Sequence, residues 1–564
     1  MVYLKDFEYF RPKATKISYL QTFEGTTNTA RKFESTTPRT ASKDTTWVTI
    51  LMPYIRDYCA TASIQGIRYL THPEFKLYEK IIWFFIMVAT SIACIFVYID
   101  LAELYQTQRI QTTVSDSVYP VFFVPFPSIG LCLPYRIDWQ RLKKEAPQKF
   151  LPANASRETL YTFHEFFDEI GDMKFSNIME ISPLFERYTK LNLSLIDDVD
   201  ILKVVEFLTL PCTEVFEGNC TWRKTTYNCC DLFSLERTET GICYVFNSAV
   251  SPKDKERMEK DPYYPYHNSK SGDGTGLQAR MIIDEEKISP KFEGFLGIYV
   301  MIKQAQQWSA DVKFVNYNTY TKLGIGSQLT ETTNRTRDVP PEDRHCIFED
   351  EVNHHLYKKI PGLQYWSGNC RTRCHQEYLV KLCKCNLNLL FPTTKSDNFT
   401  ICKPSDFKCI YDHANIFSME YHELESLYID GIGNDSMTCN CLNNCIQLLY
   451  NGFFNSAPLE GINYTDSIKY VHMDIHFQTP YILKYRTSMR YTFVELLANF
   501  GGIIGLFLGA SMLSAIELFY YFTIGMYARL QKPLKEVLAQ RKATPSKKKH
   551  FKKSKSNNVI FYKY

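Results

Sequence analysis

The sequence predicts a two-span α-helical membrane protein in which the two spans enclose a large, disulfide-rich extracellular domain. Three observations predict this class. Two long apolar segments lie toward the two ends of the 564-residue chain, and each is long enough to cross a bilayer. Sixteen of the eighteen cysteines lie between Cys132 and Cys445, as expected for a region in an oxidising compartment. All seven N-glycosylation sequons lie between the two apolar segments, at Asn154, Asn192, Asn219, Asn334, Asn398, Asn434 and Asn463.

Residues 1–80 are polar and mildly basic, and we interpret them as a cytoplasmic N-terminal region. The first span, residues 81–99, reads IIWFFIMVATSIACIFVYI and contains no charge. Because a long polar stretch precedes this segment, we interpret it as a signal anchor and not as a cleaved signal peptide. Nineteen consecutive uncharged residues also argue against a buried core helix of a soluble protein.

The second span, residues 493–528, is followed by a basic tail at 529–564 that holds a single acid, Glu536. An excess of lysine and arginine beside a span marks the cytoplasmic side. Two spans then place both termini in the cytoplasm and residues 100–492 outside, as in a two-pass plasma-membrane protein. We interpret the lysine-rich tail as a solvated, disordered segment, with binding to anionic membrane lipid as the alternative.

Composition and motifs exclude several classes of function. The 65 basic residues nearly balance the 61 acidic residues, so no basic field for nucleic acid is expected. The glycine-rich stretch SGDGTG at 271–276 lacks the spacing of a phosphate loop, and we interpret it as a surface turn. The sequence contains no G-x-S-x-G motif of a hydrolase, no H-E-x-x-H motif of a zinc protease and no Walker A lysine, so no enzyme activity or cofactor is predicted. No metal site is predicted either, because the cysteine spacings include no C-x2-C pair.

The second span has a composition unlike that of a simple lipid-facing anchor. Gly501, Gly505 and Gly509 recur at four-residue spacing, and we expect them to share one face of a helix. Such a face suits close helix packing. Ser511 and Glu517 lie in or beside the same sector, and an acid within a span usually faces a bundle interior or a water-filled cavity. Packing and pore lining are compatible, and several copies around an axis would form a cation-permeable constriction.

This span closely resembles that of the degenerin and epithelial sodium channel family, through GLFLGAS at 505–511 and IELFYY at 516–521. The resemblance implies a G-x-S selectivity filter at Gly509, Ala510 and Ser511. It also implies that Gly505 occupies a position linked to amiloride block and that Ala498 lies where added bulk holds the pore open. Glu517 matches the family's acidic residue below the filter.

The resemblance extends over nearly the whole chain, through FPSIGLCLPYRIDW with Cys132 and GICYVFN with Cys243. It implies a disulfide-rich α/β ectodomain with a palm β-sheet and a helical thumb laddered by cysteines. By this resemblance the expected pairs are Cys132–Cys243, Cys346–Cys445, Cys370–Cys441, Cys374–Cys439, Cys383–Cys409 and Cys385–Cys402. Cys212, Cys220, Cys229 and Cys230 are expected to form two more bridges, and all three pairings remain open.

Two positions depart from the family pattern. Gln65-Gly66 replaces a His-Gly pair that affects open probability, and glutamine cannot carry a charge. Asn499 stands where acid-sensing relatives have an aspartate at the outer mouth, so weaker attraction of cations is expected there. Both departures favour an accessory subunit of a mixed channel or a channel with low spontaneous activity.

Residues 470–477 alternate between apolar and polar side chains and predict a strand. We expect His472, Asp474 and His476 to lie on its solvated face. The two histidines are interpreted as ordinary surface residues, with proton sensing or metal binding as the alternative.

The resemblance implies a subunit of a homo- or heterotrimeric, voltage-insensitive, amiloride-sensitive and sodium-selective channel, most similar to the insect pickpocket branch. Its partners would be sodium ions, related subunits, membrane lipid and an extracellular ligand or tether, and its stimulus mechanical, osmotic or chemical. Alternatives are a non-conducting accessory subunit, an ATP-gated trimeric receptor or a surface adhesion protein.

Overall fold

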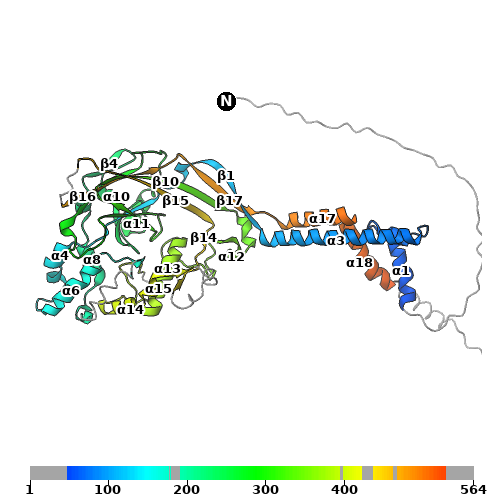
Figure 1. The fold of residues 1–564 in the computed structure, drawn as a ribbon, viewed down its shortest axis with the longest axis horizontal. Helices are drawn as coiled ribbons and strands as arrows, with labels where there is room; N and C mark the ends of the chain where they lie inside the picture. Colours follow the sequence, from blue (N-terminus) through cyan, green and yellow to red (C-terminus); the bar gives the residue numbers. More distant parts are fainter. Residues whose placement is uncertain are drawn as a thin grey trace, which may run out of the picture. The chain divides into compact units, whose positions relative to one another are not determined.

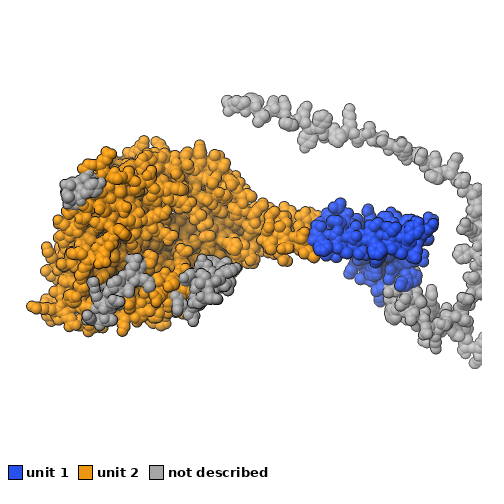
Figure 2. All heavy atoms as spheres, viewed as in Figure 1, with its two compact units in different colours: residues 1–97, 500–564 blue, residues 98–499 orange. Residues whose placement is uncertain are grey.

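The computed structural model describes residues 47–176, 178, 191–393, 398–421, 436–461 and 467–528. It divides into two compact units, one of residues 1–97 with 500–564 and the other of residues 98–499 (Figure 2). The expected basic tail and the sequons at Asn434 and Asn463 lie outside the described residues. The sequons at Asn154, Asn192, Asn219, Asn334 and Asn398 are exposed.

The first unit is helical. Its elements are α1 (Trp47–Thr61), α2 (Ile67–Thr71), most of α3 (Leu77–Thr107), most of α17 (Phe493–Leu508), α18 (Met512–Tyr520) and a π-helical turn, η7 (Tyr521–Gly525). Among the described helices, α3 alone is long and apolar enough by itself to cross a membrane, with a mean hydropathy of 2.4 over an 18-residue stretch.

The second apolar segment is not one continuous helix, which corrects the sequence-based expectation. Phe493–Leu508 and Met512–Ala528 are together apolar enough for a span, but they are bent by 73° at the break between them. Gly509 lies in this break, so it does not continue the helical face of Gly501 and Gly505. Periodicity could not predict the break, because the glycine spacing fits an unbroken helix equally well.

The second unit contains an eight-stranded sheet, in the order β1-β17-β10-β16-β7-β3-β4 with β15 paired to β10 (Figure 1). The strands are β1 (Ile110–Pro120), β3 (Asn219–Trp222), β4 (Thr225–Asn228), β7 (Leu277–Asp284), β10 (Thr319–Thr332), β15 (Ile446–Pro458), β16 (Ile468–Phe477) and β17 (Tyr481–Met489). Strand β10 is central: β15 pairs along its whole length, and its other edge pairs first with β16 and then with β17.

Strands β1 and β17 connect the sheet to the apolar helices. Ile110, just after α3, pairs with Met489, just before α17. The Arg490 N–H donates to the Arg109 carbonyl at 2.7 Å, which extends the ladder one step beyond the sheet. The chain therefore enters and leaves the sheet on two hydrogen-bonded neighbouring strands.

A second sheet, in the order β5-β6-β2-β8-β9, shares a core with the first. Its strands are β2 (Ser128–Cys132), β5 (Phe233–Thr238), β6 (Gly241–Phe246), β8 (Gly297–Lys303) and β9 (Val312–Asn316). The alternation in β7, LQARMIID, places every second side chain in this core, as expected for a strand with one buried face. Phe126, Phe246 and Phe477 pack edge-to-face where the two sheets meet.

Short helices bury their apolar faces in a separate cluster of the second unit. One group is α4 (Trp139–Lys144), α5 (Ala146–Phe150), α6 (Arg157–Glu169) and α8 (Ile201–Leu208), and another is α13 (Ser367–Cys383), α14 (Phe407–Asp412) and α15 (Ala414–Ser418) (Figure 1). The other short α-helices in the described part of this unit are α9 (Cys212–Val215), α10 (Cys229–Leu232), α11 (Pro252–Lys260) and α12 (Pro341–Arg344). Ser156 and Asp200 cap α6 and α8 by accepting main-chain N–H bonds, which explains where these helices begin.

Eight disulfides cross-link the second unit. They include the six pairs that the family resemblance implies, Cys132–Cys243, Cys346–Cys445, Cys370–Cys441, Cys374–Cys439, Cys383–Cys409 and Cys385–Cys402. The pairing left open resolves as Cys212–Cys230 and Cys220–Cys229. Cys59 and Cys94 are free thiols.

The polar face of β16 is not solvated, which corrects a second expectation. Asp474 is 0% exposed and His476 is 6% exposed. The Asp474 carboxylate accepts the Gly274 N–H at 2.9 Å and the Tyr320 hydroxyl at 3.2 Å, so the 271–276 turn closes over the strand. Burial raises the pKa of Asp474, but the bonds from His476 and the Gly274 N–H outweigh it and leave the pKa below its usual value. His472 is half-buried, and this burial lowers its pKa.

A buried histidine links α13 to two other segments. His375 Nδ1 lies 2.8 Å from a carboxylate oxygen of Glu239, and its Nε2 lies 3.1 Å from one of Glu420. Burial lowers the pKa of His375, but the two carboxylates outweigh burial and raise the pKa to about 9.

Charged His375 should therefore stabilise the fold in a pH-dependent way. Because its folded pKa lies above the unfolded value of 6.5, the contribution is fully present below about pH 6.5 and is lost as the pH rises through about 9. Thermal unfolding of wild type and His375→Gln should differ most below pH 6.5 and converge toward pH 10. His267→Gln, at an exposed histidine outside the cluster, is the control. A pH-independent difference at His375 would contradict this account.

Candidate functional site

The candidate site is the break at Gly509, Ala510 and Ser511. Gly509 has a φ of +58°, a left-handed conformation that glycine adopts without a steric penalty. Its N–H still donates to the Gly505 carbonyl at 3.0 Å, so α17 closes there. The Ser511 hydroxyl accepts the Ser514 N–H, and the Ser511 N–H donates to the Ser514 hydroxyl at 3.1 Å. This reciprocal cap begins α18 and leaves three residues of non-helical backbone between the helices.

A segment before the first apolar helix packs against the break. The Gln65 N–H donates to the Leu508 carbonyl at 3.2 Å, and this carbonyl belongs to the last residue of α17. A Cβ on Gly509 would lie 2.6 Å from the Gln65 side-chain Cδ, so the glutamine fills the space that Gly509 leaves. Two sites that the sequence treats separately, Gln65-Gly66 and the expected filter, are thus in direct contact.

The same segment also holds the first turns of α18. The Ser63 hydroxyl donates to the Ser514 hydroxyl at 2.8 Å, and the Ser63 N–H donates to a Glu517 carboxylate oxygen at 3.3 Å. Ser514 is 3% exposed. Sequence reasoning missed Ser63, because a lone serine in a polar stretch carries no signal.

Gly66 is required where the segment turns into α2. Its φ is +91°, and a Cβ on this residue would lie 2.1 Å from the Met87 sulfur of α3. Any side chain at this position would meet both a strained backbone and an occupied space. Gly66 therefore allows the segment to approach α3 as well as the break.

Helix α1 contacts the far end of α18 through aromatic side chains. The Tyr54 hydroxyl donates to the Tyr521 carbonyl in the π-helical turn, and the Tyr58 and Tyr521 ring centroids are 5.0 Å apart. A Cβ on Gly525 would lie 2.4 Å from the Tyr54 oxygen, so Gly525 makes room for this hydroxyl. The Tyr521 carbonyl also accepts the Met526 N–H, so the Tyr54 hydroxyl adds a second donor to this carbonyl. No local sequence pattern predicts this contact.

The remaining expected site residues lie along α17. Ala498 and Asn499 are exposed, and so are Gly501 and Gly505. In the part of the chain that the structure describes, no atom lies within 4 Å of a Cβ position on Gly501 or Gly502. The glycine face of α17 is therefore open within one chain, whereas Gly509 is covered.

Comparison with known proteins adds independent information. A protein-family model described as amiloride-sensitive sodium channel matches residues 58–521. Pickpocket protein 19 of Drosophila melanogaster is 29% identical over 473 residues, which cover 82% of this chain and 88% of the relative. Sodium channel protein Nach of Drosophila ananassae is 24% identical, with 83% and 86% covered. Acid-sensing ion channel 1A of Danio rerio is 22% identical, with 85% and 89% covered.

Gly509→Ala should destabilise the protein for two separable reasons. The left-handed backbone alone costs about 1–2 kcal/mol with a Cβ present, and contact with Gln65 adds to it. In a Gln65→Ala background the second part should disappear while the first remains. Thermal unfolding of the purified full chain in detergent measures both.

Gly501→Ala is the matched control, because Gly501 is helical and has open space at its Cβ position. In chains dispersed as monomers, where no second copy contacts α17, alanine there should be neutral or stabilising by about 0.5–1 kcal/mol. Equal losses at the two glycines would contradict the described break.

Tyr54→Phe should cost about 1 kcal/mol through the lost bond to the Tyr521 carbonyl. Gly525→Ala should cost more in wild type than in the Tyr54→Phe background, because the displaced atom is the tyrosine oxygen. A double-mutant cycle of thermal unfolding measures this coupling. Strict additivity would show that the two residues do not act through one contact.

Proposed function

The chain belongs to the amiloride-sensitive sodium channel family, and we propose that it is a subunit of a trimeric, voltage-insensitive, amiloride-sensitive channel selective for sodium. Members of this family are plasma-membrane ion channels that assemble as oligomers, and they are not enzymes. Family membership removes the basis for the ATP-gated receptor and adhesion alternatives. We further propose that the channel opens in response to a mechanical, osmotic or chemical stimulus, which it receives through an extracellular ligand or tether.

The observation that carries this proposal is the break at Gly509, Ala510 and Ser511. Three small residues in non-helical conformation let backbone oxygens approach an ion closely. Around a threefold axis they would form a constriction in which such oxygens replace part of the hydration shell of Na⁺. Glu517, one turn and a half into α18, would raise the local concentration of cations on the inner side. Gly505 would line the amiloride-binding region above the filter.

The membrane topology is part of the same proposal. Helix α3 would form the first span, and α17 with α18 would form the second, broken span. Residues 100–492 would lie outside and both termini inside. The distribution of disulfides supports this topology. The sixteen cysteines from Cys132 to Cys445 are all bridged, as expected on the oxidising outer side, whereas Cys59 and Cys94 are free.

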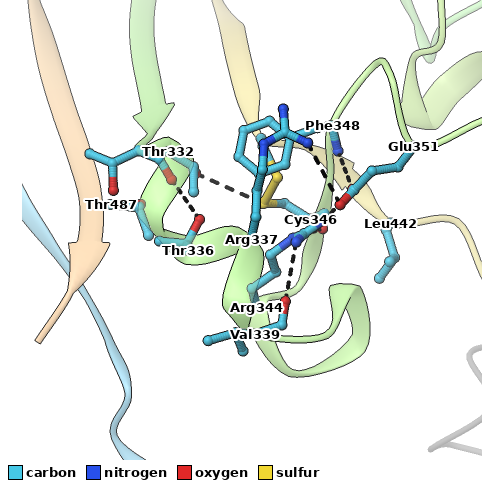
Figure 3. Close-up of a disulfide and its surroundings, with 12 residues drawn as sticks. Thr332, Thr336, Arg337, Val339, Arg344, Cys346, Phe348, Glu351, Leu442 and Thr487 are labelled. Carbon is cyan, nitrogen blue, oxygen red and sulfur yellow. Dashed lines mark hydrogen bonds and ion pairs between the residues drawn. A yellow bond between two sulfur atoms is a disulfide. The ribbon is translucent and has the colours of Figure 1, made fainter. Parts of the chain in front are cut away.

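The sheet provides a direct mechanical path from the ectodomain to the pore. In the proposed architecture the eight-stranded sheet is the palm and α13 belongs to the thumb. The Cys346–Cys445 disulfide ties the loop after β10 back to β15, and the Thr332 N–H donates to the Cys445 carbonyl at 2.8 Å (Figure 3). The Thr333 N–H donates to the Thr487 carbonyl of β17 at 2.9 Å. Movement of this loop would therefore pull on the strand that leads into α17.

An accessory role is the second candidate, and it rests on Gln65. In this chain a neutral amide, and not an ionisable imidazole, lies against Gly509. Asn499 likewise brings no charge to the outer end of α17. Such a subunit would contribute to a heteromeric pore but open rarely, or not at all, by itself.

Ala498→Val is the sharpest test of the proposed function. Ala498 is exposed on α17, and added bulk there should hold the pore open and give a standing inward sodium current that amiloride blocks. Whole-cell recording with sodium exchanged for potassium measures both selectivity and block. Ala89→Val, at an exposed alanine of α3, adds the same two methyl groups and should give no standing current.

No current from a surface-expressed Ala498→Val chain, alone or with related subunits, would contradict the proposed pore assignment. Current that appears only on co-expression would favour the accessory role.

A further inference from the structure

Three side chains with metal-binding atoms meet at an exposed place in the second unit. Glu342 belongs to α12, and His354 and His355 belong to a turn that follows β11 (Cys346–Ile347). One ligand atom from each of the three lies within 4.8 Å of the others. The Nε2 atoms of His354 and His355 lie 3.3 and 3.8 Å from the same Glu342 oxygen.

The two segments that carry these side chains are held in place without the cluster. In the turn, the His354 N–H donates to the Glu351 carbonyl at 3.1 Å, and the Tyr357 N–H donates to the His354 carbonyl at 2.9 Å. At the end of α12, buried Arg344 donates to the carbonyls of Cys346 and Val339 and pairs with the Glu351 carboxylate (Figure 3). Glu351 thus anchors both segments, so the three ligands need little reorganisation to converge.

The other three groups of potential metal ligands among the described residues already take part in disulfides or ion pairs. One group contains Cys383 and Cys409, which form a disulfide with each other, and another contains Cys439, which is bridged to Cys374. Because only a thiolate is a good metal ligand, these bridged sulfur atoms are unsuitable. In the group at Asp273, Asp474 and His476, the Lys322 ammonium already pairs with Asp273. Among the described residues, no lysine or arginine pairs with Glu342.

We propose that Glu342, His354 and His355 form a Zn²⁺ site with a water molecule as the fourth ligand. Imidazole and carboxylate together suit zinc, and three protein ligands with one open position are a common zinc arrangement. Zinc bonds of about 2.0–2.1 Å place neighbouring tetrahedral ligands about 3.3 Å apart. The His354–Glu342 distance already matches this separation, and the His355 side chain, 73% exposed, is free to make the small shift required.

Binding exchanges some local contacts for metal bonds. His354 Nδ1 accepts the Leu356 N–H at 3.3 Å, and this long bond is lost when Nε2 binds zinc and the ring proton moves from Nε2 to Nδ1. Zinc would thus bind His354 through an Nε2 atom that carries no proton.

The position of the site gives the ion a structural effect. Zinc would cross-link α12 to the turn, and both belong to the loop that the Cys346–Cys445 disulfide and the Thr333–Thr487 bond attach to the sheet. A bound ion would restrict this loop where it connects to β17.

The test is titration of the purified full chain in detergent with ZnCl₂ against a competing fluorescent indicator. Wild type should bind one ion through this site, and Glu342→Gln, His354→Asn and His355→Asn should each weaken that binding about tenfold or more. His345→Asn is the matched control. It removes an exposed imidazole from the same loop, and its φ of +55° is one that asparagine tolerates well. The control should bind as wild type does.

Hydrogen exchange provides a second measurement that needs no channel current. Zinc should slow amide exchange across residues 341–357 in wild type but not in His355→Asn. Unchanged zinc affinity in the three variants, an equal loss in His345→Asn, or no added protection in wild type would each overturn the site. These results are independent of whether the chain conducts sodium.

Discussion

A helix that is interrupted within an apolar segment leaves main-chain donors and acceptors that must find other partners. The first unit is organised around this constraint. The Leu508 carbonyl receives the Gln65 N–H, Ser511 and Ser514 cap each other, and Ser63 reaches both Ser514 and Glu517. The break is thus stabilised by a segment more than four hundred residues away in sequence.

The same principle explains the distribution of glycine. Gly509 and Gly66 have positive φ and are in contact with Gln65 and Met87 respectively, so both glycines are required by conformation and by space. Gly501 has neither requirement in an isolated chain. In the proposed oligomeric pore, the approach of another copy or of a permeating ion to α17 would account for its lack of a side chain.

In the second unit, covalent and charged links concentrate where loops meet the sheet. The Cys346–Cys445 bridge, buried Arg344 and Glu351 fix the loop between β10 and α13 (Figure 3). His375 joins α13 to Glu239 and Glu420. Buried charges need partners, so each such cluster specifies one arrangement of the segments around it.

The sequence by itself determined the two apolar segments, the oxidised window of cysteines and the family, because span length, cysteine content and a motif such as GLFLGAS are local properties. It also predicted the β16 strand from its alternation. Only the tertiary structure decided that the second segment breaks at Gly509, that Asp474 is buried, and that Cys212 pairs with Cys230. The same holds for the contacts of Ser63 and Tyr54 and for the meeting of Glu342 with His354 and His355. Each depends on contacts between residues distant in sequence, which no local pattern encodes.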